Sequence, residues 1–300
     1  MKLNFIHHRL LSFFPKSCHR AVDETISIIN ALVIIFLIRT FIFGLYQVPS
    51  GSMEKTLLVG ESLVSDKLSV WFTPIKRGEV IAFNQPNYEY SENAFVNLMQ
   101  RYVLGIFWGP QNWTKRVIAI PGDRIQGRIE DSKTVVYING EKIDEPYVNT
   151  YPLARQVKTG TAAEFNPYNR ADYANLQFIS YDVTKSPQDQ PFYKTSFDKL
   201  FMHNGEIILI QPGTPQDRGI DVYDVTLKDN EYWCMGDNRL GSSDCREVGP
   251  IDGKLIHGRV IFRLISWDDP ETSWMIVSFL KNPITFWSKI RWNRCFQWVS

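Results

Sequence analysis

The chain of 300 residues has few of the residues that build metal sites and disulfides. It contains four cysteines and five histidines, with no Cys-x-x-Cys pair and no histidine cluster beside one. This pattern argues against a zinc site, so we predict no metal. Cys234 and Cys245 are close enough in sequence for a disulfide. Spacing alone does not fix the Cα separation that a disulfide needs, so two free thiols are the alternative.

The chain also lacks an excess of charge. Its 33 basic and 32 acidic residues leave a net charge of +1, and such a balance gives no field to attract nucleic acid, which we exclude as a partner. Apolar residues make up 44 % of the chain, which is ample for a core. Aromatic residues make up 14 %, including nine tryptophans. Because such rings are favoured where an apolar phase meets water, this content indicates contact with membrane lipid.

A single long apolar run extends from Ile26 to Tyr46 and carries one charge, Arg39. Its length is close to the ~20 residues that a helix needs to cross a bilayer, and Arg39 is near enough to one end to reach the interface. A buried core helix and a cleaved secretory signal with an apolar region over 26–38 are the alternatives. Apolar residues cover all faces and no small-x-small cleavage pattern follows. We therefore predict one uncleaved membrane-spanning helix over 26–46.

The segment 1–25 predicts the direction of this anchor. Its four basic residues outnumber its two acidic ones, and basic residues in a short flank are retained in the cytoplasm. We therefore expect a cytoplasmic N-terminus and a body on the opposite side. In a bacterium this is the periplasmic or outer face of the inner membrane. The charged residues are Lys2, Arg9, Lys16, Arg20, Asp23 and Glu24.

Short β-rich runs separated by turn signals fill the region 47–270. The strongest signal is Asn139-Gly140, because a type I′ turn needs positive φ at both central residues. We predict a mainly β protein with an antiparallel body and a polar insertion at about 149–190. The tail 271–300 mixes basic and aromatic residues, and it fits either a lipid interface or a terminal helix packed on the body. The predicted strands are Glu79–Phe83, Thr114–Ile120, Thr134–Ile138, Glu206–Ile210, Val222–Leu227 and Gly258–Ile265.

Residues 49–53 read PSGSM, and the second serine, Ser52, lies a few residues beyond the apolar run. A serine hydroxyl is a weak nucleophile that needs a base nearby, and a desolvated lysine can fill that role. Lys115 is a candidate, because strand alternation places it on one face with Trp113 and Val117. Burial there would lower the pKa of its amine toward neutrality. The alternatives are a linker serine and a solvated lysine at a sheet edge.

Residues 236–246 read GDNRLGSSDCR and combine glycines, small hydroxyls and paired charges. The alternating charges fit a structured loop in which ion pairs hold a site in shape, and the alternative is a surface turn.

Taken in order, PSGSM after an anchor, KRVIAIPGD from Lys115 and GDNRLGSSDCR resemble the bacterial type I signal peptidases, as do RGEVIAF at 77–83 and YINGEKIDEPY at 137–147. The resemblance implies a membrane-bound serine endopeptidase that removes N-terminal signal peptides from exported precursors. It implies that Ser52 attacks the scissile carbonyl and that Lys115 is the general base.

The resemblance also implies supporting roles. The Ser50 hydroxyl and the Ser52 N–H would form the oxyanion hole, and Ser242 would orient the lysine. Four residues of the final segment would form a structural polar network: Asp237, Arg239, Asp244 and Arg246.

The resemblance implies that a precursor binds as an extended strand between two segments, Gln47–Val48–Pro49 and Asn112–Trp113–Thr114. Shallow pockets would select small residues in an Ala-x-Ala-like site before the cut. No metal or organic cofactor is implied. The expected partners are precursors with signal peptides and membrane lipid, and the protein-export machinery is a further candidate.

The chain departs from the family pattern at three positions. Lys55 stands where the usual Met-x-Pro-Thr-Leu has proline, Trp113 where tyrosine is frequent, and Cys245 where serine is frequent. These departures leave open a dedicated processing protease, such as a pilin-maturation enzyme, beside a general signal peptidase. A membrane-tethered binding protein without turnover is the non-enzymatic alternative. A self-cleaving repressor would need a soluble DNA-binding head in place of the anchor.

Overall fold

The computed structural model describes residues 19–102, 109–166, 169, 171–216, 219–268 and 275–299. Two compact units divide at Phe43 and Gly44. Most of the predicted cytoplasmic segment, including Cys18, lies outside the described residues.

The N-terminal unit is a helix, α2 (His19–Leu37), which continues as one π-helical turn, Ile38–Ile42. The stretch Arg20–Ile42 has 23 residues and a mean hydropathy of 2.2, so it is long and apolar enough to span a membrane. The helix begins and ends earlier than the predicted span 26–46. The residues after Ile42 form strand β1 (Phe43–Gln47), which pairs with a strand of the main sheet. Their backbone groups are therefore satisfied by a sheet ladder instead of a helix.

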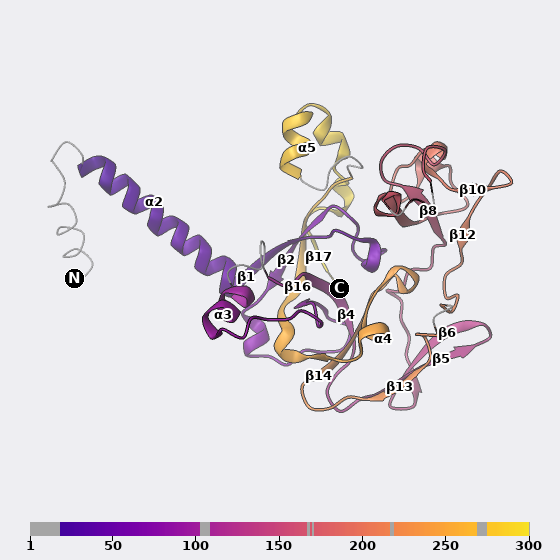
Figure 1. The fold of residues 1–300 in the computed structure, drawn as a ribbon, viewed down its shortest axis with the longest axis horizontal. Coiled ribbons are helices and arrows are strands. Elements are labelled where there is room, and N and C mark those ends of the chain that lie inside the picture. The colour runs from indigo at the N-terminus through magenta and orange to yellow at the C-terminus, as the bar shows by residue number, and fades with distance from the viewer. Residues whose placement is uncertain are drawn as a thin grey trace. The chain divides into compact units, whose positions relative to one another are not determined.

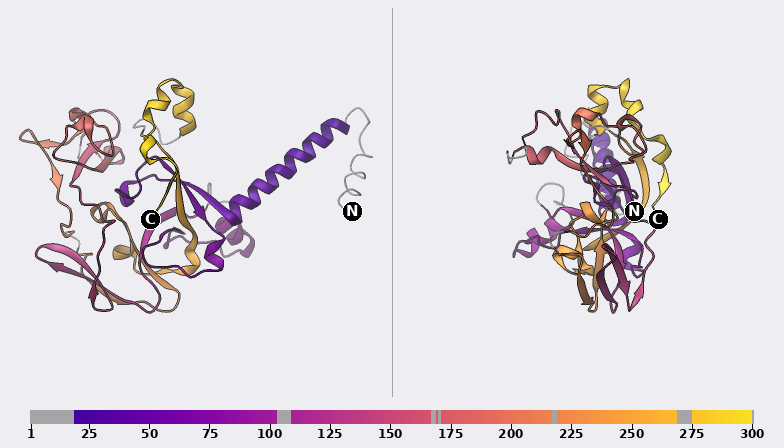
Figure 2. Two further views of the ribbon diagram at one scale, coloured as in Figure 1. Left: turned by 180° about the vertical axis from the view of Figure 1, so that it is seen from behind. Right: turned by 90° about the vertical axis from the view of Figure 1, so that its right-hand side faces the viewer.

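An eight-stranded sheet forms the centre of the body, with the long strand β16 (Ile256–Ser266) running through it (Figure 1). Its pairs of defined register are antiparallel, so the predicted mainly β, antiparallel fold is confirmed. Figure 2 shows the strands of the body from two further directions. The other strands are β2 (Glu61–Asp66), β3 (Val80–Asn84), β4 (Asn112–Ala119), β14 (Glu231–Met235), β15 (Ile251–Asp252) and β17 (Gln297–Trp298).

A four-stranded sheet is formed by residues that lie between β4 and β14 in the chain, and it contains the predicted hairpin. Asn139 and Gly140 have φ values of 53° and 88°, as a type I′ turn requires, and they connect β6 to β7. The strands are β5 (Arg124–Glu130), β6 (Lys133–Ile138), β7 (Glu141–Lys142) and β13 (Tyr223–Thr226).

The polar insertion carries its own small sheets. A three-stranded sheet consists of β8 (Leu153–Val157), β9 (Leu176–Ser180) and β12 (Leu209–Ile210), and a hairpin consists of β10 (Met202–His203) and β11 (Glu206–Ile207). The predicted strand 206–210 is thus divided between two sheets. The inserted sheet extends to residue 210, beyond the predicted limit of 190. We refer to residues 149–210 as the inserted unit.

Few helices accompany the strands. They are α3 (Ala94–Tyr102), α4 (Cys245–Val248) and α5 (Met275–Lys281), with single 3₁₀ turns at Gly51–Met53, Ser69–Trp71, Asp172–Asn175, Pro187–Asp189, Phe197–Lys199, Arg239–Gly241, Gly253–Leu255, Thr285–Lys289 and Trp292–Arg294.

Both faces of β3 are buried, because its alternate residues enter two different hydrophobic clusters. Ile81 and Phe83 belong to a cluster that reaches the four-stranded sheet. Val80 and Ala82 belong to a second cluster, which also holds side chains of segment 48–57. Burial of these apolar groups contributes roughly 1.5–3 kcal/mol for each large side chain. Strand β3 is therefore held on both faces, and its pairing with β4 fixes the position of the side chains on β4.

The C-terminal tail packs on the body through two arginines. Arg291 donates to the Val59 carbonyl at 2.6 Å, and Arg294 donates to the Thr56 carbonyl at 2.9 Å and to Glu61 at 2.7 Å. Several tail aromatics nevertheless remain exposed: Trp287, Trp292, Phe296 and Trp298. The tail therefore packs on the body, and contact of its exposed rings with lipid stays a prediction.

Candidate active site

The 3₁₀ turn Gly51–Met53 presents Ser52 at the end of β1. Met53 and Leu57 are fully buried in the cluster beneath β3, so the turn is anchored directly beside the serine. The Glu54 N–H donates to the Gly51 carbonyl at 3.0 Å and closes the turn. We refer to residues 50–57 as the nucleophile turn.

Residues from the predicted loop 236–246 hold this turn from the other side. The Asn238 side chain donates to the Gly51 carbonyl at 3.0 Å, and its backbone N–H donates to the Ser52 carbonyl at 3.1 Å. Gly236 lies so close to the Ser52 carbonyl and the Ser242 side chain that a Cβ at this position has no room. Glycine is therefore required for the close approach of the two segments.

Lys115 lies on β4 opposite Ile81 of β3, and its amine Nζ lies 2.8 Å from the Ser52 hydroxyl Oγ. Its side chain is buried, with a residue exposure of 5 %. Burial lowers the pKa of Lys115 to about 8, although the nearby carboxylate of Asp244 opposes this shift. An amine with this pKa is largely neutral just above pH 8, so it can accept a proton there.

Activity should therefore depend on pH through Lys115. We expect kcat/KM to fall as pH drops through about 8, because protonated Lys115 cannot accept the serine proton. A pH series of peptide cleavage rates measures this. A rate that stays constant from pH 9 down to roughly pH 6 would contradict a lysine base.

The structure brings two further predicted serines near the pair. Ser50 Oγ donates to Ser52 Oγ at 3.5 Å, so it lies beside the nucleophile. The Ser242 side chain is buried beside Gly236, and among the described residues its hydroxyl makes no hydrogen bond to Lys115. Its orienting role stays a prediction.

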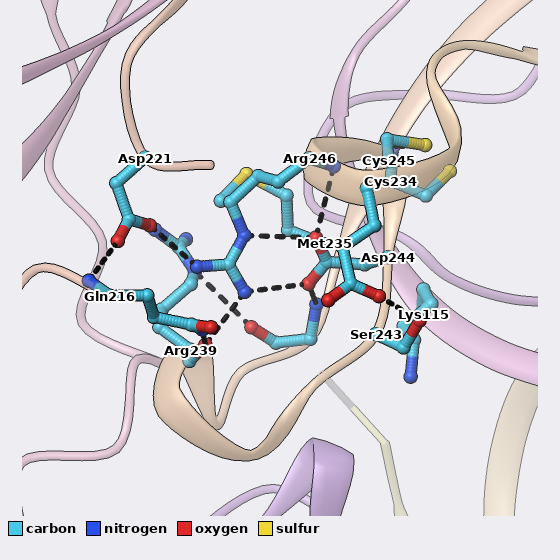
Figure 3. Close-up of polar contacts among 12 residues, drawn as sticks. Lys115, Gln216, Asp221, Cys234, Met235, Arg239, Ser243, Asp244, Cys245 and Arg246 are labelled. Carbon is cyan, nitrogen blue, oxygen red and sulfur yellow. Dashed lines mark hydrogen bonds and ion pairs between the residues drawn. The ribbon is translucent and has the colours of Figure 1, made fainter. Parts of the chain in front are cut away.

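The predicted support residues form buried ion pairs next to the site. Arg246 donates to Asp244 at 2.9 Å and to Asp221 at 2.8 Å, so its guanidinium lies between two carboxylates (Figure 3). Burial alone would raise the pKa of Asp244, but the hydrogen bonds and charge of Arg246 hold it below its usual value. Arg246 also donates to the Arg239 carbonyl at 2.7 Å. This cluster fixes the loop that follows β14.

The second predicted pair of support residues finds partners elsewhere in the chain. Asp237 accepts hydrogen bonds from Arg116 at 2.9 Å and 2.8 Å, and Arg239 donates to Glu145 at 3.0 Å. Arg116 follows the candidate base on β4, and Asp237 follows β14, so this pair ties both strands to the loop.

Sequence reasoning missed three partners of this network: Arg116, Glu145 and Asp221. Arg116 is the next residue after Lys115, and the structure buries it against Asp237. Glu145 and Asp221 lie far in sequence from their arginines. An unpaired charge is strongly disfavoured in a core. An acidic residue beside an apolar run was therefore the available sign that a buried arginine would pair with it.

The three departures from the family pattern leave the serine–lysine pair in place. Lys55 has a φ of 82° and donates to the carbonyls of Pro146 and Val148, so its amine is engaged away from Ser52. Trp113 lies with its ring centroid 5.9 Å from Lys115 Nζ. Cys245 and Cys234 are both buried free thiols, so the disulfide does not form.

The predicted substrate segments lie on strand edges. β14 pairs with β4 only between Arg116 and Ala119, so residues 112–114 have no strand partner on that side within the described part of the chain. Residues 47–49 continue from β1 toward Ser52, with Val48 hydrogen-bonded to Glu61 and Gly60. An unpaired edge can accept an added strand. The described residues contain no group of three or more His, Cys, Asp or Glu side chains suited to a metal.

Comparison with known proteins gives the family of this chain. The family model described as "Signal peptidase, peptidase S26" matches residues 22–267. The chain therefore belongs to the signal peptidase family, whose members are serine peptidases and hydrolases.

Its relatives include a signal peptidase I from Buchnera aphidicola subsp. Schizaphis graminum, with 27 % identity over 83 % of this chain and 76 % of that protein. A signal peptidase I from Haemophilus influenzae is 25 % identical over 83 % of this chain and 70 % of that protein. A signal peptidase IB from Staphylococcus aureus is 27 % identical over 81 % of this chain and 88 % of that protein.

Proposed function

We propose that this chain is a membrane-anchored signal peptidase in which Ser52 is the nucleophile and Lys115 the general base. One observation carries the proposal. The two reacting atoms lie 2.8 Å apart, and burial lowers the pKa of Lys115 to about 8, so that its amine is mostly neutral above that pH. Family membership supports the activity, namely removal of signal peptides from precursor proteins.

In this mechanism Ser52 Oγ attacks the scissile carbonyl carbon while Lys115 Nζ accepts its proton. The carbonyl oxygen becomes an oxyanion, and the C–N bond breaks when Lys115 returns the proton to the leaving amine. Water then attacks the acyl-enzyme ester while Lys115 takes its proton. The ester bond from the acyl carbon to Ser52 Oγ breaks, Lys115 returns the proton to Oγ, and the signal peptide leaves with a free carboxylate. The Ser50 hydroxyl and the Ser52 N–H stabilise the oxyanion in this mechanism, and the position of Ser50 Oγ 3.5 Å from Ser52 Oγ supports the part of Ser50.

The precursor binds as an added strand along residues 112–114, with residues 47–49 on its other side. The unpaired edge of β4 supports this arrangement, because main-chain hydrogen bonds can accept many sequences. Small residues in an Ala-x-Ala-like site fit beside Trp113. We further propose that the apolar helix anchors the chain in the bacterial inner membrane, with the N-terminus in the cytoplasm, the body on the outer face, and lipid and the export machinery as partners. The length and hydropathy of this helix and the basic residues before it support this orientation.

Cleavage of a defined precursor tests the proposal. The purified protein in detergent is incubated with a precursor that carries Ala-x-Ala before its mature N-terminus, and mass spectrometry maps the cut. We expect a single cut after the second alanine. A cut elsewhere, or none, would replace this function with that of a dedicated protease or a binding protein.

A dedicated processing protease is the second candidate, because the Trp113 departure borders the site, with its ring centroid 5.9 Å from Lys115 Nζ. A panel of unrelated precursors separates it from a general signal peptidase. A general enzyme cleaves most of the panel at comparable rates, whereas a dedicated one cleaves a single type.

A further inference from the structure

Three consecutive side chains after Ser52 fasten the nucleophile turn to three different segments. Lys55 donates to the carbonyls of 146 and 148, and Thr56 donates to Asp237. Glu54 reaches the inserted unit, where it accepts hydrogen bonds from Ser180. Lys55 keeps a left-handed backbone at φ 82°, which a non-glycine residue adopts only when its surroundings hold it there.

The Glu54 contact is the most buried of the three. The side chain is 1 % exposed, and its Oε2 accepts from the Ser180 N–H at 2.9 Å and from the Ser180 hydroxyl at 2.7 Å. Asn149 donates to the same hydroxyl at 2.9 Å and fixes its direction. On its other side the carboxyl packs against Gly51, where no side chain has room. Glu54 thus links β9 to the residue that precedes the nucleophile.

The inserted unit also takes a hydrophobic residue from the same turn. Leu58, just after the turn, is fully buried in a cluster with Ala154, Ile179, Tyr181 and Leu200. The inserted unit therefore contacts the region around Ser52 through both an apolar anchor and a polar one.

We propose that Glu54 is a positioning residue of the active site, whose carboxylate, held by Ser180, braces the nucleophile turn and aims Ser52 at Lys115. This role rests on the function proposed above for Ser52 and Lys115. The inserted unit then contributes to catalysis, because Ser180 at the end of β9 holds the Glu54 carboxylate in place.

The charge of Glu54 fits this role. Burial raises its pKa to about 7, while the Ser180 hydrogen bonds, the Tyr193 phenol and the Arg291 guanidinium favour the ionised form. Above pH 8, where Lys115 is neutral, Glu54 is therefore a carboxylate. Protonation below pH 7 weakens its charge-assisted hydrogen bonds and loosens the turn.

The full-length protein in detergent is compared with Glu54→Gln, Ser180→Ala and a matched control, Glu206→Gln, which removes an exposed carboxylate from the inserted unit. We expect Glu54→Gln to lower kcat about 10- to 100-fold, with KM within roughly twofold of the original. Ser180→Ala should lower kcat several-fold, and Glu206→Gln should not change it.

Two readouts separate positioning from a merely structural contact. In the original chain log kcat/KM should fall with a slope steeper than one between about pH 7 and 6, since both Lys115 and Glu54 become protonated there. In Glu54→Gln the slope should be about one over the same range. Glu54→Gln should also raise Tm at pH 8 by several degrees. A folded-state pKa raised from 4.5 to about 7 gives stability that is complete below pH 4.5 and lost as pH rises through 7. Glutamine stays neutral at pH 8, so the variant does not lose this stability. If Glu54 only made a stabilising contact, its replacement would instead lower Tm.

An unchanged kcat or an unchanged slope in Glu54→Gln would overturn the proposal and leave the proposed function intact. If Glu54→Gln does not fold, Ser180→Ala is used in its place. A several-fold loss of kcat in Ser180→Ala then supports the proposal, and an unchanged kcat overturns it. If the original chain cleaves no precursor, the proposed function fails. The effect of Glu54 on the nucleophile turn is then tested by hydrogen exchange of residues 50–57. Faster exchange in Glu54→Gln but not in Glu206→Gln supports positioning, and equal exchange overturns it.

Discussion

Replacement of Ser52 by alanine is expected to lower kcat/KM by about 10⁴- to 10⁶-fold. Without Oγ no acyl-enzyme forms, and the buried amine of Lys115 has no hydroxyl to deprotonate. Lys115→Met should give a similar loss, because methionine keeps the apolar stem and removes the base. The double variant should lose no more than either single variant, since the two groups act as a unit.

Rates of precursor cleavage measure this effect, with Tm as a check on folding. Matched controls are Ser288→Ala and Lys254→Met, which change exposed side chains in the same chain. Both controls should cleave at the original rate. A Ser52→Ala protein that still cuts after Ala-x-Ala would require a different nucleophile and would end the serine–lysine mechanism.

Replacement of Arg246 by methionine is expected to lower the free energy of unfolding by about 3–5 kcal/mol. The guanidinium lies between Asp244 and Asp221, and its loss leaves two buried carboxylates without their cation. Activity should also change, because Arg246 helps to lower the pKa of Lys115 and Asp244 raises it. The low-pH limb of the rate profile should therefore move to higher pH in Arg246→Met.

Denaturant unfolding measures the stability change, and the pH series measures the second effect. Arg124→Met is the matched control, because its ion pair with Asp224 is exposed and its loss should leave the unfolding midpoint nearly unchanged. Adding Asp244→Asn to Arg246→Met should restore part of the lost stability. Equal midpoints for Arg246→Met and Arg124→Met would show that the buried cluster does not stabilise the loop.

Local patterns predicted the features that depend on neighbouring residues. Asn139-Gly140 specified its hairpin, and the alternation around Lys115 placed that side chain among apolar neighbours before any contact was known. The position of Ser52 just beyond an apolar helix also follows from the order of residues alone. In each case the physical cause lies within about ten residues of the effect.

Contacts between distant segments could not be predicted in this way. Glu54 follows the serine closely, but its partner Ser180 lies 126 residues further on, and nothing in either local sequence indicates the other. The same holds for Arg116 and Asp237, which are separated by 121 residues. The helix ends before Tyr46 because residues 43–47 pair with β2 as strand β1. Their apolar side chains suit either a helix or a strand, so the sequence alone did not indicate this end.

Two arginines of the C-terminal tail support the segment around the nucleophile, although they are made much later in translation. Arg291 and Arg294 donate to carbonyls of Val59 and Thr56, so the segment around the nucleophile is held by residues made more than two hundred positions later. A chain still growing on the ribosome lacks these donors until residues 291–294 have been made. The serine is thus made early, but the turn around it gains these supports only more than two hundred residues later.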